Sequence, residues 1–135
     1  MDRVIKFRYT IVRPNGHTFH RDFTLQDIEQ GKVVDCFSAN KVGGRDQIHR
    51  RQLTGPKDRN GKEMYDGDIL HFVDPNNYSR PKVFTSVIQW FQEGCAWECS
   101  EIGGPTSRGL YIFDAPRMEV IGNRWENPEL MEQNV

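Results

Sequence analysis

The chain has 135 residues, and its 18 lysine and arginine residues against 19 aspartate and glutamate residues give a formal net charge of −1 at pH 7. This balance excludes strong attraction of the whole molecule to DNA or anionic lipid, so such binding would need a local patch. The length predicts one domain, or one domain with a small appended lobe. Three cysteines, no export signal and no apolar run long enough to cross a membrane predict a soluble cytoplasmic protein with reduced thiols.

Residues 1–42 are predicted to form a small α+β unit that combines a hairpin with a short helix. Val4–Val12 is rich in β-branched and aromatic residues, as is typical of a strand. Asn15 and Gly16 tolerate the backbone conformation of a tight turn, and His17–Phe23 then alternates like a returning strand.

Signals for one short helix follow the hairpin. Thr24 and Asp27 resemble a capping box and Gly31 is a typical helix terminator, so a helix is predicted between them. Val33–Phe37 is predicted to be a third strand because of its β-branched and aromatic residues. Residues 43–51 lack hydrophobic periodicity and contain two adjacent glycines, which predicts a flexible connector.

Residues 52–135 consist of short β-like runs separated by tight turns, which predicts a small barrel or sandwich and a mainly β, β-rich α+β fold class. The runs are Ile69–Val73, Val83–Phe91, Ala96–Cys99, Leu110–Phe113 and Met118–Ile121. The expected core residues are Ile69, Phe72, Val87, Trp90, Trp97, Tyr111, Phe113 and Ile121. Asn127 suits an N-cap and Pro128 the first helical position, so a helical turn is predicted at the end of the chain.

Two long segments, Arg51–Leu70 and Glu119–Leu130, resemble the signature and closing motifs of the YopX family. The residues expected to shape turns and strand ends in them are Thr54, Gly55, Asp58, Asn60, Gly61, Tyr65, Gly67, Asp68, Gly122, Asn123, Asn127 and Pro128. The resemblance implies a phage or prophage protein with an SH3-like barrel over residues 52–135. It also implies no established enzymatic activity, and hence no catalytic residue to assign.

Three groups of side chains are of types that bind metals: Cys95 and Cys99 with His71 or His49, His17 with His20, and Asp66 with Asp68. A structural zinc site needs four ligands, normally with closer cysteine pairs, and no second pair exists. The histidines occupy opposite faces of one strand, and the aspartates suit turn capping better than magnesium binding for a nuclease. We therefore expect no metal, no cofactor and no enzymatic activity.

Residues 43–62 carry the main charge asymmetry, an excess of four positive charges. The basic residues are Arg45, Arg50, Arg51, Lys57, Arg59 and Lys62. A small barrel with a basic edge can bind nucleic acid, although the acidic remainder of the surface repels a polyanion.

The favoured hypothesis is a non-enzymatic protein-interaction module in the host-cell cytoplasm. It is expected to form a homo-oligomer and to bind a phage or host protein, with no role at a membrane. The alternative is a nucleic-acid-binding accessory protein that uses residues 43–62.

Overall fold

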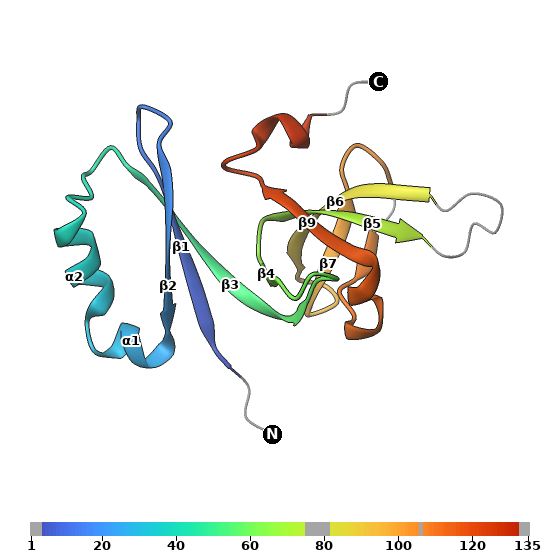
Figure 1. Cartoon of the computed structure of the whole chain (residues 1–135), viewed down its shortest axis with the longest axis horizontal. Helices are drawn as coiled ribbons and strands as arrows, with labels where there is room; N and C mark the ends of the chain where they lie inside the picture. Colours follow the sequence, from blue (N-terminus) through green and yellow to red (C-terminus); the bar gives the residue numbers. More distant parts are fainter. Residues whose placement is uncertain (1–3, 75–81, 106, 133–135) are drawn as a thin grey trace. The chain divides into compact units, whose positions relative to one another are not determined.

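A computed structural model describes residues 4–74, 82–105 and 107–132. The chain divides into two compact units, Met1–Leu53 and Thr54–Val135. The strands form two antiparallel sheets, one of four strands in the order β2-β1-β3-β4 and one of five in the order β8-β7-β6-β5-β9 (Figure 1). The mainly β fold class is therefore confirmed. None of the helices in the described part of the chain is long and apolar enough to cross a membrane.

The predicted hairpin forms the start of the first unit. β1 (Lys6–Val12) pairs with β2 (Thr18–Thr24), and Phe7 lies opposite Phe23. On its other side β1 pairs with β3 (Gln47–Lys57). Residues 47–51 of the expected flexible connector thus belong to a paired strand, because β1 supplies hydrogen-bonding partners that the sequence pattern does not reveal.

Two helices connect β2 to β3. In α1 (Leu25–Glu29) the Thr24 hydroxyl accepts from the Asp27 N–H at 3.2 Å, and the Asp27 carboxylate accepts from the Thr24 N–H at 3.0 Å, so the capping box is confirmed. α2 (Lys32–Ala39) replaces the expected strand over Val33–Phe37. The spacing of Val33, Cys36 and Phe37 places their apolar side chains on one helix face, and this packing outweighs β propensity.

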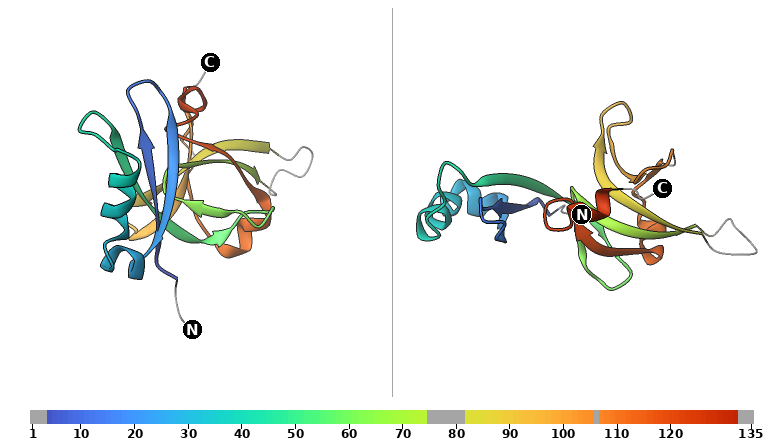
Figure 2. Two further views of the ribbon diagram at one scale, coloured as in Figure 1. Left: turned by 60° about the vertical axis from the view of Figure 1, so that its left-hand side comes forward. Right: turned by 90° about the horizontal axis from the view of Figure 1, so that it is seen from above.

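An aromatic cluster forms the core of the first unit. Tyr9, Ile11 and Phe23 are buried and pack against residues of α1 and α2. The two helices lie beside the sheet of this unit (Figures 1 and 2). The ring of Tyr9 lies edge-on to Phe23 at 5.4 Å and to Phe37 at 5.8 Å between centroids. Alternation along β1 therefore sends every second side chain toward the helices.

The second unit contains the five-stranded sheet. Its elements after β3 are β4 (Glu63–Tyr65), β5 (Asp68–Asp74), β6 (Lys82–Phe91), β7 (Ala96–Glu101), β8 (Ser107–Gly109), the 3-10 helix η1 (Ile112–Arg117), β9 (Met118–Asn123) and the 3-10 helix η2 (Pro128–Met131). Four of the predicted runs are confirmed as β5, β6, β7 and β9. The run Leu110–Phe113 is wrong as a strand, because Asp114 N–H bonds the Tyr111 carbonyl and starts η1. The helical turn predicted at Pro128 is confirmed as η2.

The expected SH3-like barrel is not found in the described residues. β8 and β9 are the two edges of the sheet, so these strands do not close on themselves. β8 has only three residues, which leaves little backbone for pairing with a further strand. The second unit is therefore an open antiparallel sheet (Figure 2).

Both faces of this sheet carry core residues. Ile69, Phe72 and Val87 are buried as expected, and Trp97 and Ile121 are partly buried. Trp90 and Tyr111, also expected in the core, are 46% and 62% exposed. Trp90 is the last residue but one of β6, and Tyr111 lies outside the strands, directly before η1. The side chain of Phe113 lies outside the described residues.

Gly67, between β4 and β5, holds the backbone at a φ of 86°, and a side chain there would meet the ring of Trp125. Gly67→Ala should lower the free energy of unfolding by about 1–3 kcal/mol, because strain and a steric clash add. Gly61→Ala is the matched control, since Gly61 has a φ of 78° and open space around it. Gly61→Ala should lower the free energy of unfolding by about 1 kcal/mol. Urea unfolding of the two variants measures how much more Gly67→Ala destabilises the protein. Equal costs would contradict the role assigned to Trp125.

Candidate functional site

The two segments that resemble family motifs lie next to each other in the structure. β5 pairs with β9, with Asp68 opposite Asn123 and Leu70 opposite Val120. The Gly67 carbonyl also accepts a hydrogen bond from the Arg124 N–H at 3.0 Å. The motif residues thus join the beginning and the end of the second unit.

Asp58 makes the longest-range of these connections. One of its carboxylate oxygens accepts from the N–H groups of Asn60 and Lys62, both at 2.9 Å, and the other accepts from the Val120 N–H at 3.0 Å. Burial by itself would raise the pKa of Asp58, but these three backbone donors lower it below its ordinary value. The carboxylate therefore stays charged and fixes the turn between β3 and β4 against β9.

Asn123 and Asn127 organise the chain after β9. The Asn123 side-chain oxygen accepts from the N–H groups of Trp125 at 3.1 Å and Glu126 at 2.9 Å. The Asn127 side-chain oxygen accepts from the Asn123 N–H at 3.2 Å. A side chain at Gly122 would collide with Asn127, so glycine at this position leaves room for the turn.

The other motif residues also occupy structural positions. The Thr54 hydroxyl donates to the Met64 carbonyl at 2.8 Å, and Asp68 accepts from the Tyr65 N–H at 2.8 Å, which supports turn capping rather than magnesium binding. Tyr65 is fully buried. Gly55 lies within β3, Asn60 and Gly61 lie in the following turn, and Pro128 is the first residue of η2.

The six basic residues of the 43–62 segment do not share one environment. Arg51, a candidate nucleic-acid contact under the alternative hypothesis, is only 1% exposed, and its guanidinium donates to the Thr10 hydroxyl at 3.1 Å, so burial argues against that role. Arg45 and Arg50 are exposed residues of the first unit. The exposed residues of the second unit are Lys57, Arg59 and Lys62. Lys57 and Arg59 line a depression of about 390 Å³ together with Asp58, Ala115 and Pro116.

The side chains considered as metal ligands show no shared geometry. Within the described ranges no three histidine, cysteine, aspartate or glutamate side chains are grouped so that they could hold a metal ion. Cys95 is exposed in the turn between β6 and β7, whereas Cys99 is buried in β7. Burial, reinforced by Asp114 and Glu98, raises the pKa of Cys99 to about 12, so its thiol stays protonated.

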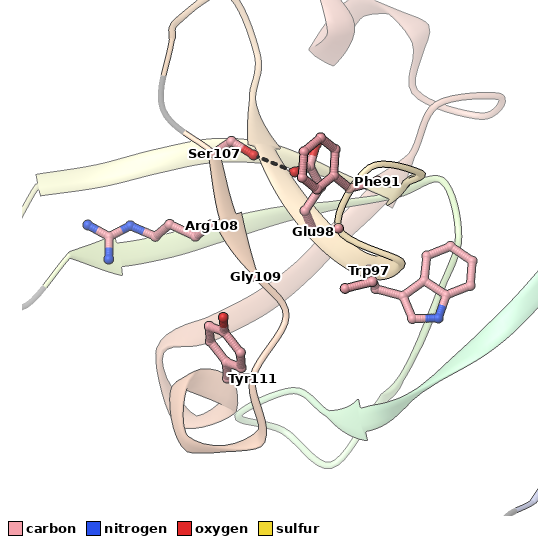
Figure 3. Close-up of a pocket in the computed structure, with 9 residues that line it drawn as sticks. Phe91, Trp97, Glu98, Ser107, Arg108, Gly109 and Tyr111 are labelled. Carbon is pink, nitrogen blue, oxygen red and sulfur yellow. Dashed lines mark hydrogen bonds between the residues drawn. The ribbon is translucent and has the colours of Figure 1, made fainter.

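A pocket of about 560 Å³ lies beside the β6–β7 turn and β8 (Figure 3). We call it the Glu98 pocket, after a carboxylate that lines it, and the lining residues used below are Phe91, Trp97, Glu98, Ser107, Gly109 and Tyr111. Phe91 and Tyr111 are 42% and 62% exposed. This site was not predicted from the sequence, although the alternation of Glu98 and Ser100 along β7 is a signal that could have indicated it.

Hydrogen bonds hold the Glu98 carboxylate in place. One oxygen accepts from the Ser107 hydroxyl at 2.8 Å (Figure 3). The other accepts from the Ser100 hydroxyl at 2.9 Å and the Gln89 amide at 3.4 Å. These hydrogen bonds lower the pKa of Glu98, and the bond from Ser107 has the largest effect. No lysine or arginine in the described residues forms an ion pair with this carboxylate. The wall of the pocket therefore carries a fixed negative charge.

The strand register explains why the two exposed rings flank this charge. Glu98 lies opposite Gln89 on β6 and Gly109 on β8, so these three residues share a sheet face. Gly109 has no side chain, and the ring of Tyr111 occupies that space. Arg108 points away from Glu98, with its guanidinium 5.3 Å from the ring centroid of Phe72 (Figure 3).

Asp58→Asn should lower the free energy of unfolding at neutral pH by about 2 kcal/mol, because the Val120 N–H loses its carboxylate acceptor. Since folding lowers the pKa of Asp58, its stabilising effect is present at neutral pH and is lost as pH falls through the folded-state value. Urea unfolding at neutral pH and below about pH 4 should therefore show the two proteins converging in acid. Asp46→Asn, which affects one exposed loop contact to the Gly43 N–H, is the control. An Asp58 variant as stable as the parent would contradict this role.

Comparisons with known proteins give one family. The model of the YopX protein family matches residues 6–132. The crystal structure of protein EF1440 from Enterococcus faecalis aligns over 97% of this chain and 100% of that chain, with 21% sequence identity and a TM-score of 0.45. A comparison with curated proteins found no significant match. Because the family model spans almost the whole sequence, the chain belongs to the YopX family.

Proposed function

We propose that the chain is a non-enzymatic protein-interaction module that self-associates through the surface around the Glu98 pocket. The observation that carries this proposal is the exposure of two large aromatic side chains that line the pocket. Phe91 and Tyr111 are 42% and 62% exposed. Clustered aromatic side chains of this kind dominate the binding energy of many protein interfaces.

The chemistry of the nearby titratable groups supports an interaction role over catalysis. A general acid or base works best with a pKa near the operating pH, but the pKa of Glu98 is lowered. A nucleophilic cysteine needs a thiolate, but burial keeps the Cys99 thiol protonated. The three unpaired cysteines of the described chain also fit a reducing cytoplasm.

The edges of the five-stranded sheet are poorly suited to pairing with another strand, which favours side-chain contacts as the route to self-association. At β9 the Asp58 carboxylate and the Arg59 N–H already bond Val120 and Met118. At the opposite edge β8 is only three residues long. Because the family resemblance implies a phage or prophage protein, we extend the proposal to a phage or host protein as a further partner.

Sedimentation velocity over a range of concentrations tests the self-association. The parent protein should form a dimer or larger assembly, and Phe91→Ser combined with Tyr111→Ser should weaken the assembly about tenfold or more. Val34→Ser is the matched control, because it removes a side chain that is 68% exposed in the first unit. A parent protein that stays monomeric, or a double variant that assembles like the control, would refute the proposal.

A second candidate function is nucleic-acid binding, favoured by the paired positions of Lys57 and Arg59 in one depression. With Arg51 buried, few phosphate contacts remain, and each adds roughly 0.9 to the slope of log affinity against log salt. Fluorescence anisotropy with labelled DNA should therefore detect only weak binding that disappears near physiological salt. Tight binding that survives there, and that Lys57→Glu with Arg59→Glu abolishes in a folded protein, would make this the main function.

A further inference from the structure

We infer that the Glu98 pocket is a cation-binding site that receives an arginine side chain from a second copy of the chain. This inference rests on the proposed self-association and names the contact that would direct it. The pocket has the three elements that recognise a guanidinium in water. These are a fixed carboxylate, flat aromatic walls and an opening to solvent, supplied by Glu98, Phe91 and Tyr111.

The hydrogen bonds of Glu98 leave a defined place for one more donor. The oxygen that accepts from Gln89 and Ser100 has both lone pairs engaged, whereas the oxygen that accepts from Ser107 has one lone pair left. Because Ser107 lies on β8 and Ser100 on β7, the carboxylate is held from both strands before any partner arrives. A pre-organised acceptor loses little freedom on binding.

Charge complementarity points to a second copy as the source. The same unit exposes Lys57, Arg59 and Lys62, and among the described residues none of the three forms an ion pair with a carboxylate. Lys62 interacts electrostatically with the Asp58 carboxylate, which leaves Lys57 and Arg59 as the cations of the unit for which the described residues show no anionic partner, and Glu98 as the anion without a cationic one. In a dimer, a cation of each copy can pair with the Glu98 carboxylate of the other copy. A two-fold symmetric dimer would form this ion pair twice.

Arg59 is the cation best prepared for this contact. Its N–H bonds the Met118 carbonyl at 2.9 Å, and the neighbouring Asp58 fixes the turn through three hydrogen bonds. The side chain therefore extends from a rigid backbone into solvent. Its planar guanidinium can stack on the rings of Phe91 and Tyr111 in a way that a lysine ammonium cannot.

The first experiment tests the chemistry of the pocket with small probes. Blocked arginine amide and its uncharged isostere, blocked citrulline amide, are titrated separately into isotopically labelled protein and followed by NMR. The arginine probe should shift the resonances of Phe91, Glu98 and Tyr111 and bind about tenfold more tightly than the citrulline probe. Glu98→Gln should remove this preference, and Glu93→Gln, in the neighbouring turn between β6 and β7, should keep it. Equal binding of the two probes, or no binding of either, would overturn the inference.

The second experiment tests the source of the cation by sedimentation. Glu98→Arg and Arg59→Glu should each weaken self-association about tenfold, and the two changes combined in one chain should restore it. Circular dichroism confirms that each variant is folded. If the assembly depends on Phe91 and Tyr111 but is unaffected by either charge change, the proposed function stands and the second-copy contact is refuted. If the combined variant stays as weak as the single ones, Arg59 is not the side chain bound by Glu98.

Discussion

The second unit depends on one buried carboxylate that satisfies three backbone donors at once. Asp58 is 6% exposed, and the Val120 N–H that it binds is 62 residues further along the chain. A buried charge is tolerated only when hydrogen bonds replace the water it loses. Here the replacement comes from the tight turn after β3 and from the edge of β9, so the same interaction closes the turn, covers the sheet edge and presents Arg59 to solvent.

The two units are stabilised by different kinds of interaction. In the first, aromatic packing around Tyr9 joins the hairpin to the two helices, and the capping box at Thr24 starts the first of them. In the second, side-chain acceptors at chain reversals, such as Asp58 and Asn123, add to the apolar core. Hydrogen-bonded reversals fix the geometry of a short strand more closely than apolar contacts do. Glu98 is held in the same way, by hydrogen bonds from Ser107, Ser100 and Gln89.

Features set by neighbouring residues were predictable from the sequence, and features set by distant ones were not. The capping box of Thr24 and Asp27 and the helical turn at Pro128 follow from local chemistry. The strand expected over Val33–Phe37 was wrong because packing against the sheet outweighs propensity. The burial of Arg51 depends on Thr10, 41 residues away, and the Glu98 pocket depends on the register of three strands. No single segment carries that information.

The boundary between the two units falls inside a strand, and this affects how the chain can be divided. β3 continues from Gln47 to Lys57, across the division after Leu53. A fragment ending at Leu53 would keep Gln52 opposite Phe7, but it would lose the part of the strand in which Thr54 binds the Met64 carbonyl. Each fragment would gain a cut strand end with unpaired backbone groups, which invites aggregation. Recombinant fragments should therefore overlap and each include all of β3.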